Sequence, residues 1–275
     1  MSRKKLDKFV GQFRVGARGK TGIGGEKASD KCGFRDREWA CQQLAAEHEL
    51  LKQLQVRLFA GGRKALLVVF QAMDTGGKDG TIRKVLGPLN PQGVEVTGFK
   101  KPTPEELAHD YLWRIHRAAP RKGMIGVFNR SHYEDVLVVR VHGWAPGKVI
   151  ERRYDEINRF EKHLADNGTG IVKICLNITR DEQKERLQAR LDEPDKNWKF
   201  DVGDLAERKL WPKYMKAYDT ALRRCSTPWA PWYLVPANRK WVRNLVVARI
   251  VRHALEGMKL KYPPAPDGLK DVVIT

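Results

Sequence analysis

The stretch ALLVVFQAMDTGGKDGT, residues 65–81, is the most informative part of this chain. Its first six residues form an apolar run typical of a buried strand, and a glycine-rich turn followed by helix-compatible sequence comes directly after it. A strand, a glycine turn with a lysine and a helix start together predict a phosphate cradle, because backbone N–H groups and the positive end of the helix face the anion. The alternative interpretation is a surface turn with accidental charges.

The turn departs from the usual P-loop pattern G-x-x-x-x-G-K-[ST] at two positions. Ala72 replaces the first glycine, and Asp79 replaces the hydroxyl residue that commonly binds magnesium. Asp74 and Asp79 instead place two carboxylates beside Lys78, so the loop is suited to a phosphate together with a divalent cation. Substrate contacts are predicted for the residues around this lysine: Gly76, Gly77, Asp79, Gly80 and Thr81.

Composition restricts the class of partner. The 275 residues include 52 Lys and Arg against 33 Asp and Glu, which gives a formal net charge of +19, and 41% are apolar. The apolar fraction is sufficient for a folded core, and the charge predicts a polyanionic partner such as nucleic acid, an anionic membrane or a chain of phosphates. A basic surface that only keeps the protein in solution is the alternative.

The four cysteines are scattered and form no C-x-x-C pair. This spacing argues for reduced thiols and against a zinc site or a disulfide scaffold. The sequence shows neither a signal peptide nor an apolar stretch long enough to cross a bilayer. We therefore expect a soluble cytoplasmic protein that does not act at a membrane.

Strands alternate with helices along most of the chain, which predicts an α/β fold with a parallel sheet sandwiched between helices. Strands are expected at residues 65–70, 94–97, 124–128, 171–178 and 232–235. Residues 1–35 are rich in Gly, Lys and Arg without sustained periodicity, and we expect a flexible basic arm there, followed by a single domain over residues 36–275.

A charged segment at about residues 186–210 interrupts this alternation. It is broken by Pro194 and Gly203 and is rich in basic residues. A basic insertion late in a P-loop chain predicts a helical lid that closes over phosphates. An ordinary helix–loop–helix with a solvated face is the alternative.

A second polar motif, GVFNRSHYEDVLVVRV at residues 126–141, follows the strand predicted at 124–128. Ligands of open parallel sheets collect at the carboxyl ends of the strands, so this motif is expected to share a crevice with the glycine loop. Phosphoryl transfer needs cations and oriented reactants more than covalent chemistry. Lys78 and Arg130 are predicted to clamp phosphate oxygens, and Asp74 and Asp135 to hold magnesium.

Glu134 is predicted to bind a second metal ion or to orient the acceptor. In the alternative interpretation, Glu134 and Asp135 only supply charge to a helix start, with Arg130 and Arg140 as structural partners. His132 has no placed partner, and we interpret it as a packed side chain.

Four segments together resemble polyphosphate kinase family 2, and its class III most of all: QAMDTGGKDGTIRKVLGPLNPQGV, PTPEELAHDYLWRIHRAAPRKGMIGVFNRSHYEDVLVVRV, ARLDEPDKNWKF and APWYLVPANRKW. The resemblance covers roughly residue 36 to the C-terminus. It implies a P-loop kinase with a helical lid that transfers phosphate reversibly from inorganic polyphosphate to AMP or ADP, and a homo-oligomer. Guanine nucleotides as further acceptors and Mn²⁺ in place of Mg²⁺ stay open.

The resemblance also implies roles for individual residues. Asp74 matches the aspartate that binds magnesium and assists the acceptor phosphate, Lys78 the phosphate-binding lysine, and Asp135 the acid of the second motif. Glu134 is implied to bias acceptor preference, and Arg130 to contact the phosphate chain. The basic residues implied for the lid are Arg186, Arg190, Lys196 and Lys199.

Asn129 stands where other branches of this family carry aspartate. The amide weakens metal binding at this position, places more weight on Asp74 and Asp135, and is the pattern associated with class III. Two other functions are alternatives: a nucleotide kinase that uses ATP as donor, and a nucleic-acid-binding protein without catalysis. The aromatic residues are dispersed rather than interleaved with basic ones, which argues against a nucleic-acid platform.

Overall fold

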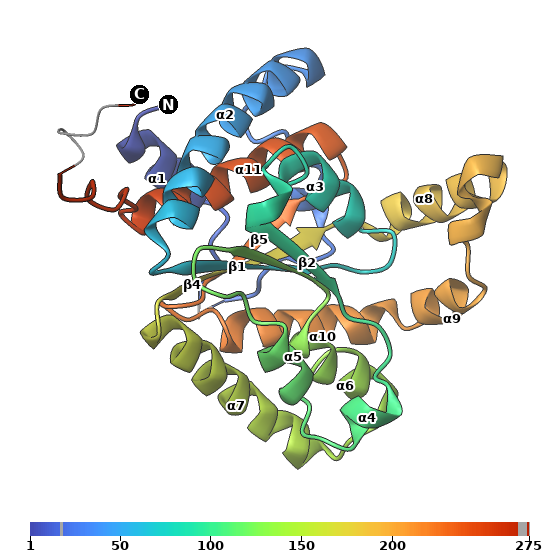
Figure 1. Ribbon diagram of the computed structural model, residues 1–275. Coiled ribbons are helices and arrows are strands. Elements are labelled where there is room, and N and C mark those ends of the chain that lie inside the picture. Colours follow the sequence, from blue (N-terminus) through green and yellow to red (C-terminus); the bar gives the residue numbers. More distant parts are fainter. Residues whose placement is uncertain (17–18, 269–273, 275) are drawn as a thin grey trace.

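The computed structural model describes residues 1–16, 19–268 and 274. Its centre is one five-stranded sheet with the order β2-β3-β1-β4-β5, in which every neighbouring pair is parallel (Figure 1). The strands are β1 (Ala65–Gln71), β2 (Val94–Gly98), β3 (Ile125–Asn129), β4 (Thr169–Asn177) and β5 (Trp232–Pro236). The predicted parallel α/β sheet is thus confirmed.

Helices cover both faces of the sheet (Figure 1). On one side lie α2 (Arg37–Gly61), α3 (Lys78–Val85) and α11 (Lys240–Gly257). On the other side lie α5 (Trp113–Arg117), α6 (Val138–His142), α7 (Gly147–Asp166) and α10 (Trp211–Arg224), with the short α4 (Pro104–Leu107). The 3₁₀ turn η3 (His132–Asp135) contacts α6 and α7. Another 3₁₀ turn, η2 (Pro91–Gly93), leads into β2.

The central strand β1 explains why its sequence is an unbroken apolar run. All seven of its residues are buried, because β3 and β4 flank it and helices cover both faces. Its register pairs Phe70 with Asn129, so β1 and β3 end side by side. The glycine loop follows the end of β1 and the second polar motif follows the end of β3, so the two motifs start side by side.

The N-terminal segment corrects our expectation of a flexible arm. It forms α1 (Arg3–Gly11) and the 3₁₀ turn η1 (Glu26–Ser29), and Leu6 and Val10 of α1 are buried. The Val15 N–H donates to the carbonyl of Trp232 on the edge strand β5, which fixes the segment to the sheet. The reason is a helical spacing of apolar residues hidden among basic ones, since Leu6, Val10 and Phe13 share one face.

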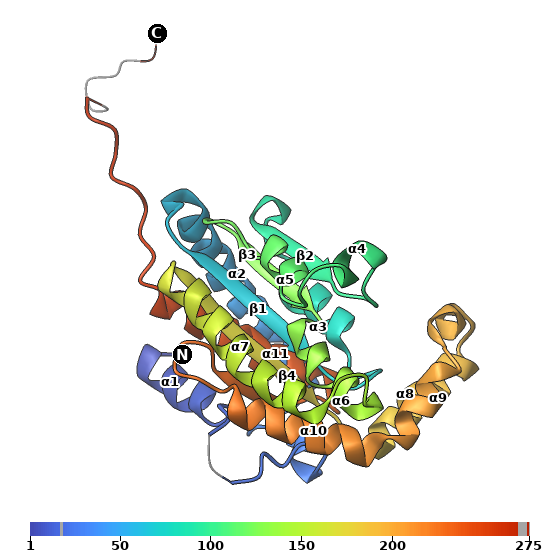
Figure 2. The same cartoon turned by 90° about the horizontal axis from the view of Figure 1, so that it is seen from below.

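The predicted lid segment contains α8 (Arg180–Asp192), the 3₁₀ turn η4 (Pro194–Lys199) and α9 (Gly203–Lys209). Figure 2 shows these elements projecting from the body of the domain beyond the sheet. Helix α8 begins where the hydroxyl of Thr179 accepts the Glu182 N–H. No helix among the described residues is long and apolar enough to span a membrane.

Candidate functional site

The glycine loop runs from the end of β1 to the first residue of α3, Lys78. Gly77 adopts a left-handed conformation with φ of 92°, and a Cβ at this position would collide with the guanidinium of Arg243. Lys78 Nζ donates to the Ala72 carbonyl at 3.0 Å, so its ammonium group lies over the loop. Burial and the charge of Arg130 lower the pKa of Lys78, against the carboxylates of the site. An anion at this position would therefore be strongly favoured.

The second motif meets this loop. Asn129 Nδ2 donates to Asp79 Oδ1 at 2.5 Å, and Arg130 Nη2 donates to Asp74 Oδ1 at 2.9 Å. Arg130 has a φ of 65°, a left-handed conformation that is unfavourable for a residue with a Cβ. Its N–H bonds the Phe70 carbonyl at 3.1 Å, which holds this turn on the end of β1. The two motifs thus converge at one edge of the sheet, as their positions after β1 and β3 predict.

The structure places Glu134 of the second motif close to Lys78. The charges that act on the pKa of Lys78 include those of Arg130, Asp74, Glu134 and Asp79. Burial raises the pKa of Glu134, against the opposing effects of Arg130, Lys78 and a hydrogen bond from a buried glutamine. The carboxylates of Asp74, Asp79 and Glu134 therefore all lie close enough to Lys78 to raise its pKa against the effect of burial.

Asp135 instead faces Arg153 of α7, with Nη1 and Oδ1 3.3 Å apart. Burial raises its pKa to about 6, while Arg153 and Arg114 act in the opposite direction. The Asp135 carboxylate is thus paired with an arginine of α7, and a magnesium site formed by Asp74 and Asp135 stays a prediction. A role for Asp135 in catalysis stays a prediction.

Of the four lid cations named from the sequence, Arg186 is the one that contacts the loop. Its Nη1 donates to the Thr75 carbonyl at 2.9 Å and its Nη2 to the Ala237 carbonyl at 2.6 Å. Glu182 accepts from its Nε at 2.7 Å and orients the guanidinium. Arg186 therefore ties the glycine loop to the segment between β5 and α11.

The other three lid cations have partners within the lid. Arg190 donates to Asp204 at 2.8 Å and to the Lys199 carbonyl at 2.9 Å. Lys196 pairs with Glu193, and Lys199 lies over the Trp198 ring at 4.8 Å. These contacts stabilise the lid itself and do not reach the loop.

Two basic residues at the start of α11, Lys240 and Arg243, were not predicted from the sequence as site residues. Only 3% of Arg243 is exposed, and its guanidinium donates to the neutral amide of Asn244. Burial and Arg186 lower the pKa of Arg243 to about 10. Burial, followed by Arg186, Lys196 and Arg243, lowers the pKa of Lys240 as well. Cations that repel one another at a helix N-terminus form a site for an anion of high charge. The signal was present in the sequence as N-R-K-W-V-R directly after a strand.

The residues at the loop also fit a magnesium ion. Asp74 is partly exposed and Asp79 is exposed, and both offer the oxygen ligands that this ion prefers. The described residues contain no group of three or more metal-ligating side chains placed to hold a metal ion by themselves. Magnesium is commonly bound by one or two carboxylates together with phosphate oxygens of the substrate, and this loop provides such a set.

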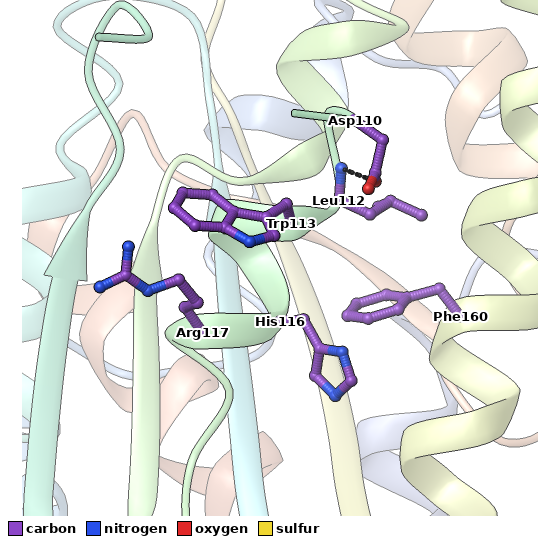
Figure 3. Close-up of a pocket in the computed structure, with 6 residues that line it drawn as sticks. All are labelled: Asp110, Leu112, Trp113, His116, Arg117 and Phe160. Carbon is purple, nitrogen blue, oxygen red and sulfur yellow. Dashed lines mark hydrogen bonds between the residues drawn. The ribbon is translucent and has the colours of Figure 1, made fainter. Parts of the chain in front are cut away.

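A cavity of about 360 Å³ lies between α5 and α7 on the other side of the sheet from α3 (Figure 3). Its lining is Asp110, Leu112, Trp113, His116, Arg117 and Phe160. The aromatic face of Trp113 is already occupied, since the His109 ring stacks on it at 4.0 Å and the Arg117 guanidinium lies 4.6 Å from its centre. None of the residues predicted for phosphate binding lines this cavity, so we place the functional site at the ends of β1 and β3.

Comparison with known proteins agrees with this geometry. Residues 35–263 match the family model described as polyphosphate kinase 2. The chain is 52% identical over 235 residues to the AMP/ADP-polyphosphate phosphotransferase of Meiothermus ruber, a match that covers 86% of this chain and 88% of the relative. It is 45% identical over 264 residues to the ADP-polyphosphate phosphotransferase of Rhodopseudomonas palustris, covering 92% and 91%. The crystal structure of polyphosphate kinase 2 from Arthrobacter aurescens TC1 matches with a TM-score of 0.92 and 47% identity, covering 96% of this chain and 94% of that one.

Proposed function

The chain belongs to the polyphosphate kinase 2 family, and from this membership we propose that it transfers phosphoryl groups reversibly between inorganic polyphosphate and nucleotides. AMP is converted to ADP and ADP to ATP, with polyphosphate as the donor. The observation that carries the proposal is the meeting of the two motifs, with Arg130 bonded to Asp74 beside Lys78. The resemblance seen in the sequence motifs is confirmed at the level of the family.

The cations of the site would act on the phosphoryl group in transit. Its charge spreads over the equatorial oxygens, so stabilisation depends on donors already aimed at them. Lys78 supplies a point charge over the loop, and Arg130 and Arg243 supply planar guanidinium groups suited to phosphate oxygens. Asp74 would orient the acceptor phosphate and, with Asp79, hold the magnesium ion. That ion, when bound, neutralises charge on the phosphate oxygens.

The distribution of positive charge supports polyphosphate as the donor. In addition to burial, Arg186, Lys196 and Arg243 lower the pKa of Lys240, and Arg186 lowers the pKa of Arg243, so these cations lie close together between the glycine loop and the lid. A nucleoside triphosphate has only three phosphates with which to neutralise these cations, whereas a linear polyphosphate can extend along all of them. The formal net charge of +19 fits the same partner.

The decisive experiment is a donor and acceptor screen at fixed magnesium. Purified protein with ADP and polyphosphate is expected to form ATP, and with AMP to form ADP. ATP with a nucleoside monophosphate, in the absence of polyphosphate, tests the nucleotide kinase alternative. Salt-sensitive binding to DNA or RNA, with no phosphoryl transfer under any of these conditions, would instead support the nucleic-acid-binding alternative.

The proposal also covers the class, the acceptor base, the metal ion, the oligomeric state and the location of the protein. Membership in class III is supported by Asn129, whose amide reaches Asp79. Use of guanine nucleotides and of Mn²⁺ is compatible with oxygen ligands and calls for the same screen. Assembly as a homo-oligomer follows from the family resemblance, and a cytoplasmic location is supported by four scattered cysteines.

A further inference from the structure

A lysine side chain is completely buried in the middle of the sheet. Lys173 lies on β4 and has no exposed surface. Its ammonium group donates to Glu161 Oε2 at 2.5 Å, to the Tyr133 hydroxyl at 2.7 Å and to the Cys225 carbonyl at 2.7 Å. All three of its N–H donors are therefore used. Neither the phosphate-binding loop nor the lid involves this lysine.

Glu161 of α7 completes a closed network with the second motif. Its Oε1 accepts from the Tyr133 hydroxyl at 2.9 Å and contacts His132 Nε2 at 3.2 Å, while Oε2 accepts from Lys173. Glu161 and His132 are each about 1% exposed. The pair Lys173–Glu161 thus joins β4 and α7 to two consecutive residues of η3.

These two residues stand directly before Glu134 in the chain. The same short segment begins with Arg130, whose left-handed φ of 65° costs about 1–2 kcal/mol for a residue with a Cβ. Such a conformation persists only where surrounding contacts over-determine it. Ser131 lies between Arg130 and the two network residues in the chain. Its hydroxyl accepts hydrogen bonds from the Tyr133 N–H at 3.2 Å and from the Gln71 side chain at 3.3 Å. The segment that follows the strained residue is therefore fixed at three consecutive positions, Ser131, His132 and Tyr133.

Stability alone is a weak reason for such an ion pair. Replacing a buried pair with apolar side chains of similar volume is often neutral or stabilising, because the desolvation of two charges is removed. The bonds that use all three N–H donors of Lys173 and both oxygens of Glu161 do, however, specify one geometry. We propose that the Lys173–Glu161 pair, through Tyr133 and His132, is a positioning device that holds Arg130 and Glu134 against the glycine loop. The inference rests on the phosphoryl transfer proposed above.

The test compares kcat with folding stability. The single variants Lys173→Met and Glu161→Leu each leave one buried charge unpaired, and both are expected to lower the unfolding temperature. The double variant Lys173→Met/Glu161→Leu removes both charges and is expected to regain much of that loss. Measured well below its unfolding temperature, its kcat is expected to fall about ten- to a hundredfold, since a misplacement of about 1 Å has an effect of that size. The KM for ADP and polyphosphate is expected to change much less.

A matched control is available on the other side of the sheet. Glu47 of α2 is 5% exposed and pairs with Arg249 and Arg252 of α11 at 3.3 Å and 3.2 Å. Glu47→Gln breaks a buried ion network that does not contact η3, so it is expected to lower stability while kcat stays as in the wild type.

Tyr133→Phe gives a second route to the same answer. It removes one hydroxyl from the network and keeps the ring against Trp232, whose centre is 4.7 Å away. This variant decides the matter if the double variant does not fold, and the expected result is again a lower kcat with an unchanged KM. Folded variants with wild-type kcat, or a kcat loss of equal size in Glu47→Gln, would overturn the inference. A wild-type protein without polyphosphate-dependent activity would overturn the proposed function and the positioning role with it.

Discussion

Arg130 and Asp74 are joined by an ion pair of 2.9 Å, although 56 residues separate them in the chain. Arg130 follows β3 and Asp74 follows β1, and the register of the two strands brings them together. The carboxylate of Asp74 thus accepts a hydrogen bond from the Arg130 guanidinium, the group that we expect to contact phosphate oxygens. Binding of polyphosphate would therefore release Asp74 for the acceptor phosphate or a magnesium ion.

Lys78→Ala and Asp74→Asn are expected to abolish most turnover while the fold is kept. Both side chains are partly exposed, and neither belongs to the apolar core. Loss of the pre-placed Lys78 cation at the developing anion is expected to reduce kcat by about 10²–10³-fold. Loss of the Asp74 carboxylate removes a proposed ligand of the magnesium ion. Steady-state transfer from polyphosphate to ADP, with thermal unfolding of the same samples, checks this. A correctly folded Lys78→Ala protein with near wild-type kcat would remove the lysine from the site.

Arg243→Gln is expected to weaken polyphosphate binding and to reduce its dependence on salt. Each cation that neutralises a phosphate releases a counterion, so removal of one contact lowers the slope of log K against log salt by about 1. Arg249→Gln is the matched control, because it removes the same charge from the same helix at a residue already paired with Glu47. Affinity measured at several salt concentrations separates the two. Equal changes of slope in both variants would mean that only net charge matters.

Asp135 is expected to make stability depend on pH in the absence of divalent cations. Burial raises its pKa from the ordinary value of 3.8 to about 6, so the folded state binds the proton more tightly than the unfolded state. Between about pH 4 and pH 6 the free energy of unfolding should therefore fall as pH rises, by up to about 3 kcal/mol, and then level off. Asp135→Asn should remove this part of the slope in urea unfolding curves. An unchanged slope would show that Asp135 does not titrate in this range.

The sequence predicts the strands well because β1 and β4 are long apolar runs, and a parallel sheet buries such runs on both faces. It also predicts the meeting of the two motifs, since both follow strands. It does not predict which of two adjacent acids faces the lysine. Glu134 and Asp135 are neighbours in a 3₁₀ turn, and their directions depend on Arg153 of α7, which lies far along the chain.

The burial of residues within basic segments was not predicted from the sequence. Arg243 has the appearance of a surface residue of α11 until the glycine loop is packed against it. Leu6 and Val10 were hidden in a basic segment, although their spacing already suited a packed helix. In both cases tertiary packing decides whether the side chain is buried, and the composition of the segment does not show this.

Arg190 provides the last prediction, because the sequence and the structure suggest different roles for it. The family resemblance implies a basic lid residue, whereas the structure shows it joining α8 to α9 through Asp204 at 2.8 Å. If the ion pair is what matters, Arg190→Gln, Asp204→Asn and the double variant should reduce kcat by similar factors, so their effects will not add. If Arg190 instead contacts polyphosphate, Arg190→Gln should raise the KM for polyphosphate and Asp204→Asn should not. The double-mutant cycle, measured with ADP as acceptor, distinguishes a support of the lid from a contact with the donor.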